Sequence, residues 1–327
     1  MQIAVTGSIA TDHLMNFPGR FSEQLLADRL DKVSLSFLAD DLEVRRGGVA
    51  ANIAIGLGRL GIRPLLVGAA GVDFAEYGKW LEANGVDTTP VRVSETRHTA
   101  RFVCTTDADQ NQIATFYPGA MSEAREIELG PIAGRAGGLD LVLIGANDPD
   151  AMLRHTQECR CLGIAFAADP SQQLATLDGP SARQLVTGAR YLFTNDYEAS
   201  LLQERTGWTA QQVLDRVGTW ITTLGADGVR IDRTGEPTIS VPAVLTTAPS
   251  EPTGVGDAFR AGFLAGAAWK WTAERSAQLG CALATIVLES VGPQEYQLSA
   301  ADLLGRIDST HGGVVAGEIE PHLAAVS

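Results

Sequence analysis

Short runs of apolar residues recur along most of the chain, and a stretch with the spacing of an amphipathic helix separates each run from the next. A short, continuous apolar run is typical of a strand that is buried on both faces, and its alternation with helices is typical of a parallel sheet. The pattern therefore predicts an α/β fold with a mostly parallel central sheet between two layers of helices. The predicted strands are 3–6, 65–67, 139–144, 164–167, 191–193 and 220–223.

Two stretches, 13–47 and 97–118, break this alternation. Both contain segments in which apolar and polar residues alternate, as they do in a half-exposed strand. We expect these stretches to form a small antiparallel β-sheet, a lid, inserted into a large domain that comprises 1–12, 48–96 and 119–327. The β-like segments are 33–37, 101–105 and 112–117.

The second insertion is predicted to contain a hairpin, because turn-forming residues fill 107–111. If the hairpin is symmetric about Asp109, Phe102 and Phe116 lie directly opposite each other and project from the same face. From spacing alone, the two rings are either packing residues or a pair that stacks on a flat ligand.

Composition agrees with a single large enzyme core. The chain has 327 residues, of which 45% are hydrophobic and 20% charged. Its net charge of −14 argues against a nucleic acid or an anionic membrane as a partner, since both attract basic surfaces. No apolar run approaches the roughly 20 residues of a membrane span, and the four cysteines are too few for a disulfide scaffold, so we expect a cytoplasmic protein.

The segment 252–262 carries the strongest chemical signal. Gly254 and Gly256 allow a tight turn, and the small apolar residues of 258–268 predict a helix that begins there. The free N–H groups of a helix start attract anions, and Asp257 could accept the proton of an attacking hydroxyl group. The alternative is that Asp257 is only the N-cap of the helix.

This segment resembles the C-terminal signature of the ribokinase and adenosine kinase family, the PfkB carbohydrate kinases. Three other segments resemble motifs of the same family, in the same order. They are 46–54, an N-terminal Gly-Gly signature followed by Gly61; 195–198, an Asn-x-x-Glu motif; and 223–228, a Thr-x-Gly-x-x-Gly turn. The resemblance implies a ribokinase-like three-layer fold and an ATP-dependent phosphotransferase.

By this resemblance, Asp257 is the general base, and the amides of Gly254, Val255 and Gly256 form the anion hole. Glu198 is expected to hold Mg²⁺ through a water molecule. The residues implied in ATP binding are Asn195, Thr223, Gly225 and Gly228.

Two features of the sequence concern the charges around the phosphates, and the second is a departure from the family pattern. The chain has no P-loop sequence, so amides and Mg²⁺ must balance the phosphate charge, with Arg260 and Arg20 as candidate side chains. Glu251 stands where the family has Asp or another small polar residue, near a loop that binds a monovalent cation in related kinases. A role for K⁺ therefore stays open.

Within the family, the chain is most similar to the bacterial adenosine kinases, on the strength of 7–13, 34–37, 169–173 and the two phenylalanines. This similarity implies phosphorylation of the 5′-hydroxyl of adenosine to AMP, as in purine salvage, beneath a lid that can also form a homodimer contact. Asp12, which could otherwise serve only an Asx turn, would hold the ribose hydroxyls. The other residues implied in substrate binding are Gly48 and Asn52 at the sugar, Ser8, Ser36, Gln172 and Gln173 around the nucleoside, and Phe102 and Phe116 on either side of the adenine.

Two alternatives remain. The acceptor could be another nucleoside or a sugar such as ribose or fructose, because the phosphoryl-transfer residues would be the same. The protein could also be a nucleoside-binding sensor without activity, although such a sensor has no need of a base at Asp257.

Overall fold

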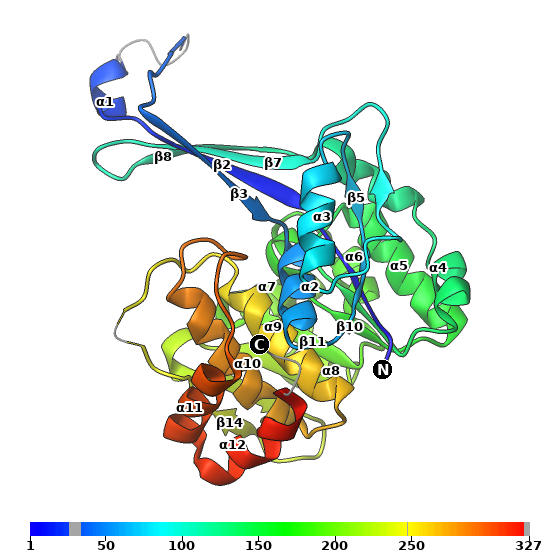
Figure 1. Ribbon diagram of the computed structural model, residues 1–327. Helices are drawn as coiled ribbons and strands as arrows, with labels where there is room; N and C mark the ends of the chain where they lie inside the picture. Colours follow the sequence, from blue (N-terminus) through cyan, green and yellow to red (C-terminus); the bar gives the residue numbers. More distant parts are fainter. Residues whose placement is uncertain (26–33, 247, 324–327) are drawn as a thin grey trace.

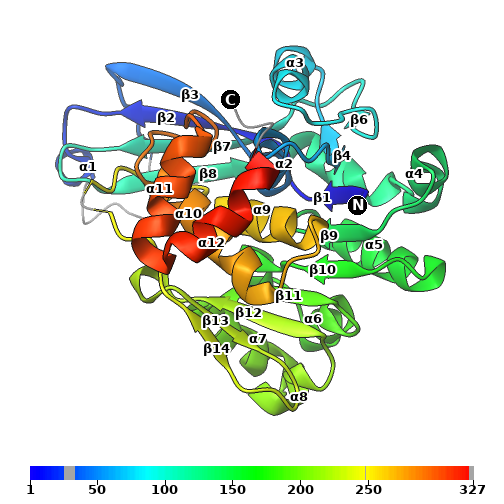
Figure 2. The same cartoon turned by 60° about the horizontal axis from the view of Figure 1, so that its bottom comes forward.

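The computed structural model describes residues 1–25, 34–246 and 248–323. Its centre is an eight-stranded sheet in the order β14-β13-β12-β11-β10-β9-β1-β4, seen best in Figure 2. Six neighbouring strands of this sheet, β12, β11, β10, β9, β1 and β4, run parallel to one another. At one edge, β13 pairs antiparallel with β12, and β14 pairs antiparallel with β13. The strands are β1 (Ile3–Thr6), β4 (Leu65–Val67), β9 (Leu141–Ile144), β10 (Phe166–Ala168), β11 (Tyr191–Asn195), β12 (Thr219–Thr223), β13 (Val229–Asp232) and β14 (Ile239–Val241).

Each face of this sheet buries its own hydrophobic core, because successive side chains of a strand point to opposite faces. In β9, Leu141 and Leu143 belong to one core, and Val142 and Ile144 belong to the other. The predicted three-layer arrangement is therefore confirmed.

Helices cover both faces of the sheet (Figure 2). The first core includes residues of α2 (Val49–Arg59), α3 (Ala75–Ala83), α9 (Val255–Ala268), α10 (Ala273–Leu288), α11 (Ala300–His311) and α12 (Gly313–Ile319). The second includes residues of α4 (Leu129–Ala136), α5 (Pro149–Leu162), α6 (Gly179–Val186), α7 (Asp196–Thr206) and α8 (Ala210–Leu214). In the part of the chain that the structure describes, no helix is long and apolar enough to cross a membrane.

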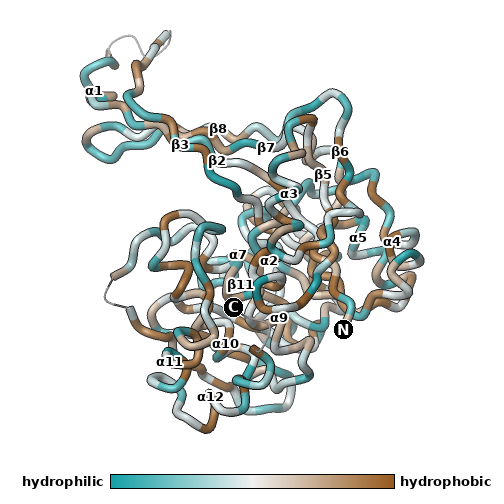
Figure 3. Tube along the Cα trace, viewed as in Figure 1, coloured by the Kyte–Doolittle hydropathy of each residue, from teal (hydrophilic) through white to brown (hydrophobic). Residues whose placement is uncertain are grey.

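A second, four-stranded sheet extends from this body (Figure 1). Its order is β3-β2-β7-β8, and we call these four strands the lid sheet. Figure 3 shows hydrophobic residues at intervals along it, well outside the body. Its strands are β2 (Ala10–Asn16), β3 (Asp41–Gly47), β7 (Ala100–Thr106) and β8 (Gln112–Tyr117); a separate pair, β5 (Ala69–Ala70) and β6 (Arg92–Val93), lies beside the body.

The lid sheet differs from the expectation in two respects. It is mixed, because β2 pairs with β7 in parallel. The prediction of a strand at 33–37 is also wrong, because 34–37 form no strand and residue 33 lies outside the described residues. The strand in this region is β3, which begins at Asp41. The reason is visible at Phe37, whose ring packs 5.0 Å from Phe17 and 4.8 Å from Phe21 of α1 (Phe21–Gln24), between ring centroids, in an aromatic cluster at the far end of the lid sheet.

The predicted hairpin is confirmed, with Phe102 opposite Phe116 in the antiparallel pairing of β7 and β8. Its turn is held by the carboxylate of Asp107, which accepts hydrogen bonds from the backbone N–H groups of Asp109 at 2.9 Å and Asn111 at 2.8 Å. The register brings both rings to one place on the lid sheet.

Candidate active site

The predicted helix begins at Val255, and Gly254 is its N-cap. Gly254 has a φ of 78°, in the left-handed region that favours glycine, and a Cβ atom there would collide with Pro293. Asp257 lies in the first turn and is not the N-cap, which excludes the simpler interpretation of this carboxylate. The first-turn N–H groups of a helix lack intrahelical partners, although that of Val255 donates to the carbonyl of Pro252 at 3.3 Å.

Residues 251–257 form the wall between two cavities. Glu251, Thr253, Gly254 and Asp257 line a cavity of about 590 Å³ on the side of the lid sheet, which we call the lid-side cavity. Pro252, Val255 and Gly256 line a cavity of about 470 Å³ on the other side, which we call the α10-side cavity. One helix start therefore faces two spaces, each within the size range of small-molecule sites.

The lid-side cavity brings together residues from widely separated segments of the chain. All but one of the residues expected at the acceptor line it; the exception is Ser36, whose neighbour Phe37 packs into the aromatic cluster at the far end of the lid sheet. The expected residues that line it are Ser8, Asp12, Gly48, Asn52, Phe102, Phe116, Gln172, Gln173, Gly254 and Asp257.

Asp12 lies on β2, beside Phe102 of β7 in the parallel register. The pKa of the Asp12 carboxyl is raised to about 6, mainly by burial and also by the negative charge of Glu251, while Arg45 opposes the rise. Arg45 on β3 is itself ion-paired with Glu251, so the lid sheet is tied to the wall between the cavities.

Gly48 is the N-cap of α2 and has a φ of 98°. A Cβ atom at this position would lie 2.6 Å from the nitrogen of Ala10 and 2.6 Å from the carbonyl oxygen of Ser8. Only glycine therefore allows β2 and the start of α2 to approach this closely at the edge of the lid-side cavity.

Asp257 is half-buried between the two cavities. Burial raises the pKa of its carboxyl to about 7, and a hydrogen bond from Asn52 opposes the rise, with Nδ2 lying 2.8 Å from Oδ2. A carboxyl group with a pKa near the working pH can accept a proton and later release it. A carboxylate in this position can accept a proton from a group bound in the lid-side cavity, as the predicted general base must.

Arg260, one turn further along α9, does not reach either cavity. Its Nε lies 2.6 Å from Oδ2 of Asp169, and both side chains are almost fully buried. Arg20 directly precedes α1, and its Nε lies 3.1 Å from Oδ1 of Asp109 in the hairpin turn of the lid sheet. The candidate role of these two arginines at the phosphates is therefore not supported.

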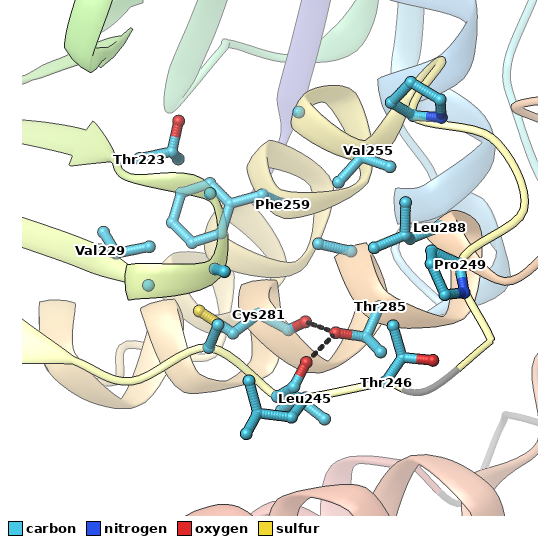
Figure 4. A pocket seen from close by; sticks show the side chains of 18 residues that line it. Thr223, Val229, Leu245, Thr246, Pro249, Val255, Phe259, Cys281, Thr285 and Leu288 are labelled. Carbon is cyan, nitrogen blue, oxygen red and sulfur yellow. Dashed lines mark hydrogen bonds between the residues drawn. The ribbon is translucent and has the colours of Figure 1, made fainter.

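Figure 4 shows the α10-side cavity, between α9, α10 and the loop around Leu245. Thr223, Gly225 and Gly228 lie along one side of it, in the hairpin between β12 and β13. The rest of the lining is mainly apolar. It includes Val244, Leu245, Val255, Phe259, Cys281, Ala284 and Leu288. Except for Val255, these residues were not anticipated, because scattered apolar residues carry no sequence signal that distinguishes a cavity lining from a core.

Asn195 lies in a shallow groove beside this cavity, and the groove shares Thr223 and Gly225 with it. Asn195 and Glu198 form a capping box at the start of α7: Oδ1 of Asn195 accepts from the Glu198 N–H at 2.7 Å, and Oε2 of Glu198 accepts from the Asn195 N–H at 2.8 Å. The second carboxylate oxygen of Glu198 is left to accept from a water molecule. This donor set fits Mg²⁺, which keeps several of its waters in proteins.

A helix start that separates two cavities and presents a carboxylate to one of them fits a phosphotransferase with an alcohol acceptor, and comparison with known proteins agrees. A model of the pfkB family carbohydrate kinases matches residues 6–300, so the chain belongs to that family.

Its relatives and structural neighbours include nucleoside kinases. The nucleoside kinase of Methanocaldococcus jannaschii is 26% identical over 295 residues, which cover 90% of this chain and 92% of that protein. The structure of Burkholderia thailandensis nucleoside kinase is 35% identical, with a TM-score of 0.83 over 93% of this chain and 99% of that one. The same kinase in complex with inosine is 33% identical, with a TM-score of 0.83 over 95% of this chain and 99% of that one.

Proposed function

We propose that the protein transfers the γ-phosphoryl group of ATP to the 5′-hydroxyl group of adenosine, giving AMP and ADP, as a purine-salvage enzyme. The observation that carries the proposal is the wall at 251–257, which presents a carboxylate to one cavity and the other side of the same helix start to a second cavity. Such a wall lets two substrates meet at one point while each has a site of its own.

In this proposal, the nucleoside occupies the lid-side cavity. The carboxylate of Asp12 accepts hydrogen bonds from the vicinal ribose hydroxyls, because an ionised carboxylate is acceptor-only. One N–H of Asn52 is held by Asp257, which leaves the other for the sugar. Phe102 and Phe116 bracket the base, and Ser8, Gln172 and Gln173 complete the lining.

ATP lies in the α10-side cavity with its phosphates toward Asn195, Thr223, Gly225 and Gly228. Asp257 takes the proton of the 5′-hydroxyl as its oxygen attacks the γ-phosphorus, and the bond from that phosphorus to the bridging oxygen of ADP breaks. The amides of Gly254, Val255 and Gly256 stabilise the charge on the transferred group, provided that the Val255 N–H turns from Pro252 to the ligand.

Glu198 would hold the Mg²⁺ that accompanies ATP through a water molecule, and the ion would supply positive charge at the phosphates. A K⁺ requirement is a separate question, because Glu251 is already paired with the cation Arg45. We expect activity without added K⁺, and turnover measured with Na⁺ or K⁺ salts tests this expectation.

The decisive experiment is a screen of adenosine, inosine, other nucleosides, ribose and fructose by ADP release. We expect the highest kcat/KM with adenosine. A preference for inosine, the nucleoside bound in the Burkholderia thailandensis complex, or for a free sugar would replace adenosine as the substrate and leave the phosphotransferase intact. Tight nucleoside binding in calorimetry without any turnover would instead favour a sensor.

We also propose that residues 13–47 and 97–118 act as a lid, and that the lid sheet forms a homodimer contact. Large apolar side chains are exposed on its two edge strands, namely Leu42 and Val44 on β3 and Ile113, Phe116 and Tyr117 on β8. Sedimentation velocity should give a dimer; a monomer at all concentrations would contradict this part of the proposal.

A further inference from the structure

A buried chain of hydrogen bonds ends at the carboxylate of Asp257. The hydroxyl of Tyr77 donates to the carbonyl of Gly47 at 2.7 Å. Nε2 of Gln294 donates to the Tyr77 oxygen at 2.6 Å and to Oδ1 of Asn52 at 2.8 Å. Asn52 in turn donates from Nδ2 to Oδ2 of Asp257 at 2.8 Å.

The direction of every bond in this chain follows from its first member. The Gly47 carbonyl can only accept, so the Tyr77 hydroxyl must donate to it and can only accept from Gln294. The amide nitrogen of Gln294 therefore faces Tyr77, and its second hydrogen points at Oδ1 of Asn52. Asn52 is thereby held with its own N–H groups toward the carboxylate.

All three intermediates are almost inaccessible to water. Gln294 is 0%, Tyr77 5% and Asn52 7% exposed. Since Gln294 and Tyr77 lie away from both cavities, water cannot readily replace a partner that either of them loses. Gln294 touches neither cavity, so its link to function runs through Asn52.

We infer that Gln294 is a positioning residue of the phosphoryl-transfer site, which orients the Asn52 amide so that an N–H, and not the carbonyl oxygen, meets the Asp257 carboxylate. This inference rests on the proposed role of Asp257 as the base. Without the Gln294 donor, the Asn52 amide is free to rotate and to place Oδ1 against the carboxylate.

The measurable consequence is the pH at which the base ionises. The Asn52 hydrogen bond lowers the pKa of Asp257, so its loss should raise that pKa above about 7. The other charged groups that act on Asp257 are Arg260 on α9, Asp169 after β10 and Glu198 on α7. None of them is changed by a substitution at position 294.

The test compares Gln294→Met, which keeps the length of the side chain but removes its donors, with Gln278→Met. Gln278 is a glutamine of α10 that is 8% exposed and accepts from Arg275, away from both cavities. For Gln294→Met we expect the midpoint of the kcat profile to rise by about one pH unit, with kcat at pH 6.5 falling roughly tenfold. KM for ATP should stay unchanged, and Gln278→Met should keep the wild-type midpoint.

A residue that only stabilises the fold would lower the melting temperature without moving the midpoint. If Gln294→Met does not fold, Tyr77→Phe provides the test. This variant removes the oxygen that accepts the hydrogen bond from Gln294, and it should shift the midpoint in the same direction. A wild-type midpoint in the folded variant refutes the inference.

If the proposed function itself is wrong, the activity measurements give a different result. In that case, wild-type protein shows no ADP release with any nucleoside or sugar, or Asp257→Asn turns over like wild type. The pKa of Asp257, followed by ¹³C NMR of its carboxyl carbon in wild type and Gln294→Met, tests the positioning even then. An equal pKa in the two proteins would overturn it.

Discussion

Replacing Asp257 with asparagine should remove activity and, above neutral pH, increase stability. Asparagine has the same shape and can still accept the hydrogen bond from Asn52, so the lid-side cavity should keep its form. It cannot accept a proton from a hydroxyl group. We expect kcat to fall roughly 10²- to 10⁴-fold, the usual contribution of a general base, while the Kd for the nucleoside changes little.

The gain in stability follows from the cost of burying the ionised carboxyl. Its pKa rises from 3.8 in the unfolded chain to about 7 in the folded protein. Because the folded state holds the proton more tightly, the stability that this group contributes is complete below pH 4 and is lost as the pH rises through 7. Between pH 5 and pH 8 the loss is at most about 2.5 kcal/mol, since Asp257 is only half-buried and solvent screens part of its charge.

Asparagine does not titrate and avoids this loss. Urea unfolding at pH 5 and pH 8 should therefore show that the advantage of Asp257→Asn over wild type grows with pH. A matched control is Asp215→Asn, which removes an exposed carboxylate at the end of α8 and should show no such growth. The reasoning is refuted if the difference between Asp257→Asn and wild type is the same at both pH values, or if the variant retains near-normal turnover.

Three further substitutions test other parts of the site. In the wild-type protein, KM for the nucleoside should fall as the pH rises through about 6, the pKa of Asp12. Asp12→Asn should raise KM and remove this pH dependence. A variant with the same pH profile of KM as the wild type would contradict the role of Asp12. Phe116→Ala should raise KM for a purine nucleoside roughly three- to tenfold with little effect on the melting temperature, because this ring is 48% exposed; equal KM values would place the base elsewhere. Gly254→Ala forces a Cβ onto Pro293 at a positive φ, so the melting temperature and kcat should both fall, and a fully active variant would show that the turn is not needed.

The fold was largely predictable because its signal is local. The runs at 3–6 and 65–67 became β1 and β4 without a change of boundary, since a strand covered on both faces needs an unbroken apolar segment. The opposition of Phe102 and Phe116 followed from counting residues on either side of one turn. In each case the residues that decide the structure are close together in the sequence.

The parts that could not be predicted depend on distant partners. The apolar residues of 33–37 were compatible with a strand, but Phe37 packs on Phe17 and Phe21 instead. Gln294 acts on Asn52, which is 242 positions away, and a glutamine in a loop has no pattern that announces such a contact. Burial and pairing, which determine what these side chains do, appear only after the chain has folded.

The same contrast explains why the reaction is easier to infer than its acceptor. Between 251 and 257, a short segment combines a glycine with a positive φ, a carboxylate toward one cavity, and the N–H groups of a helix start. All three can therefore be read from a short sequence motif. In the proposed site, the residues that would select the acceptor are Asp12, Phe102, Phe116 and their neighbours, which come from different strands and meet through the register of the lid sheet. On the proposed assignment, a change in that register would move these side chains and leave the phosphoryl-transfer motif untouched.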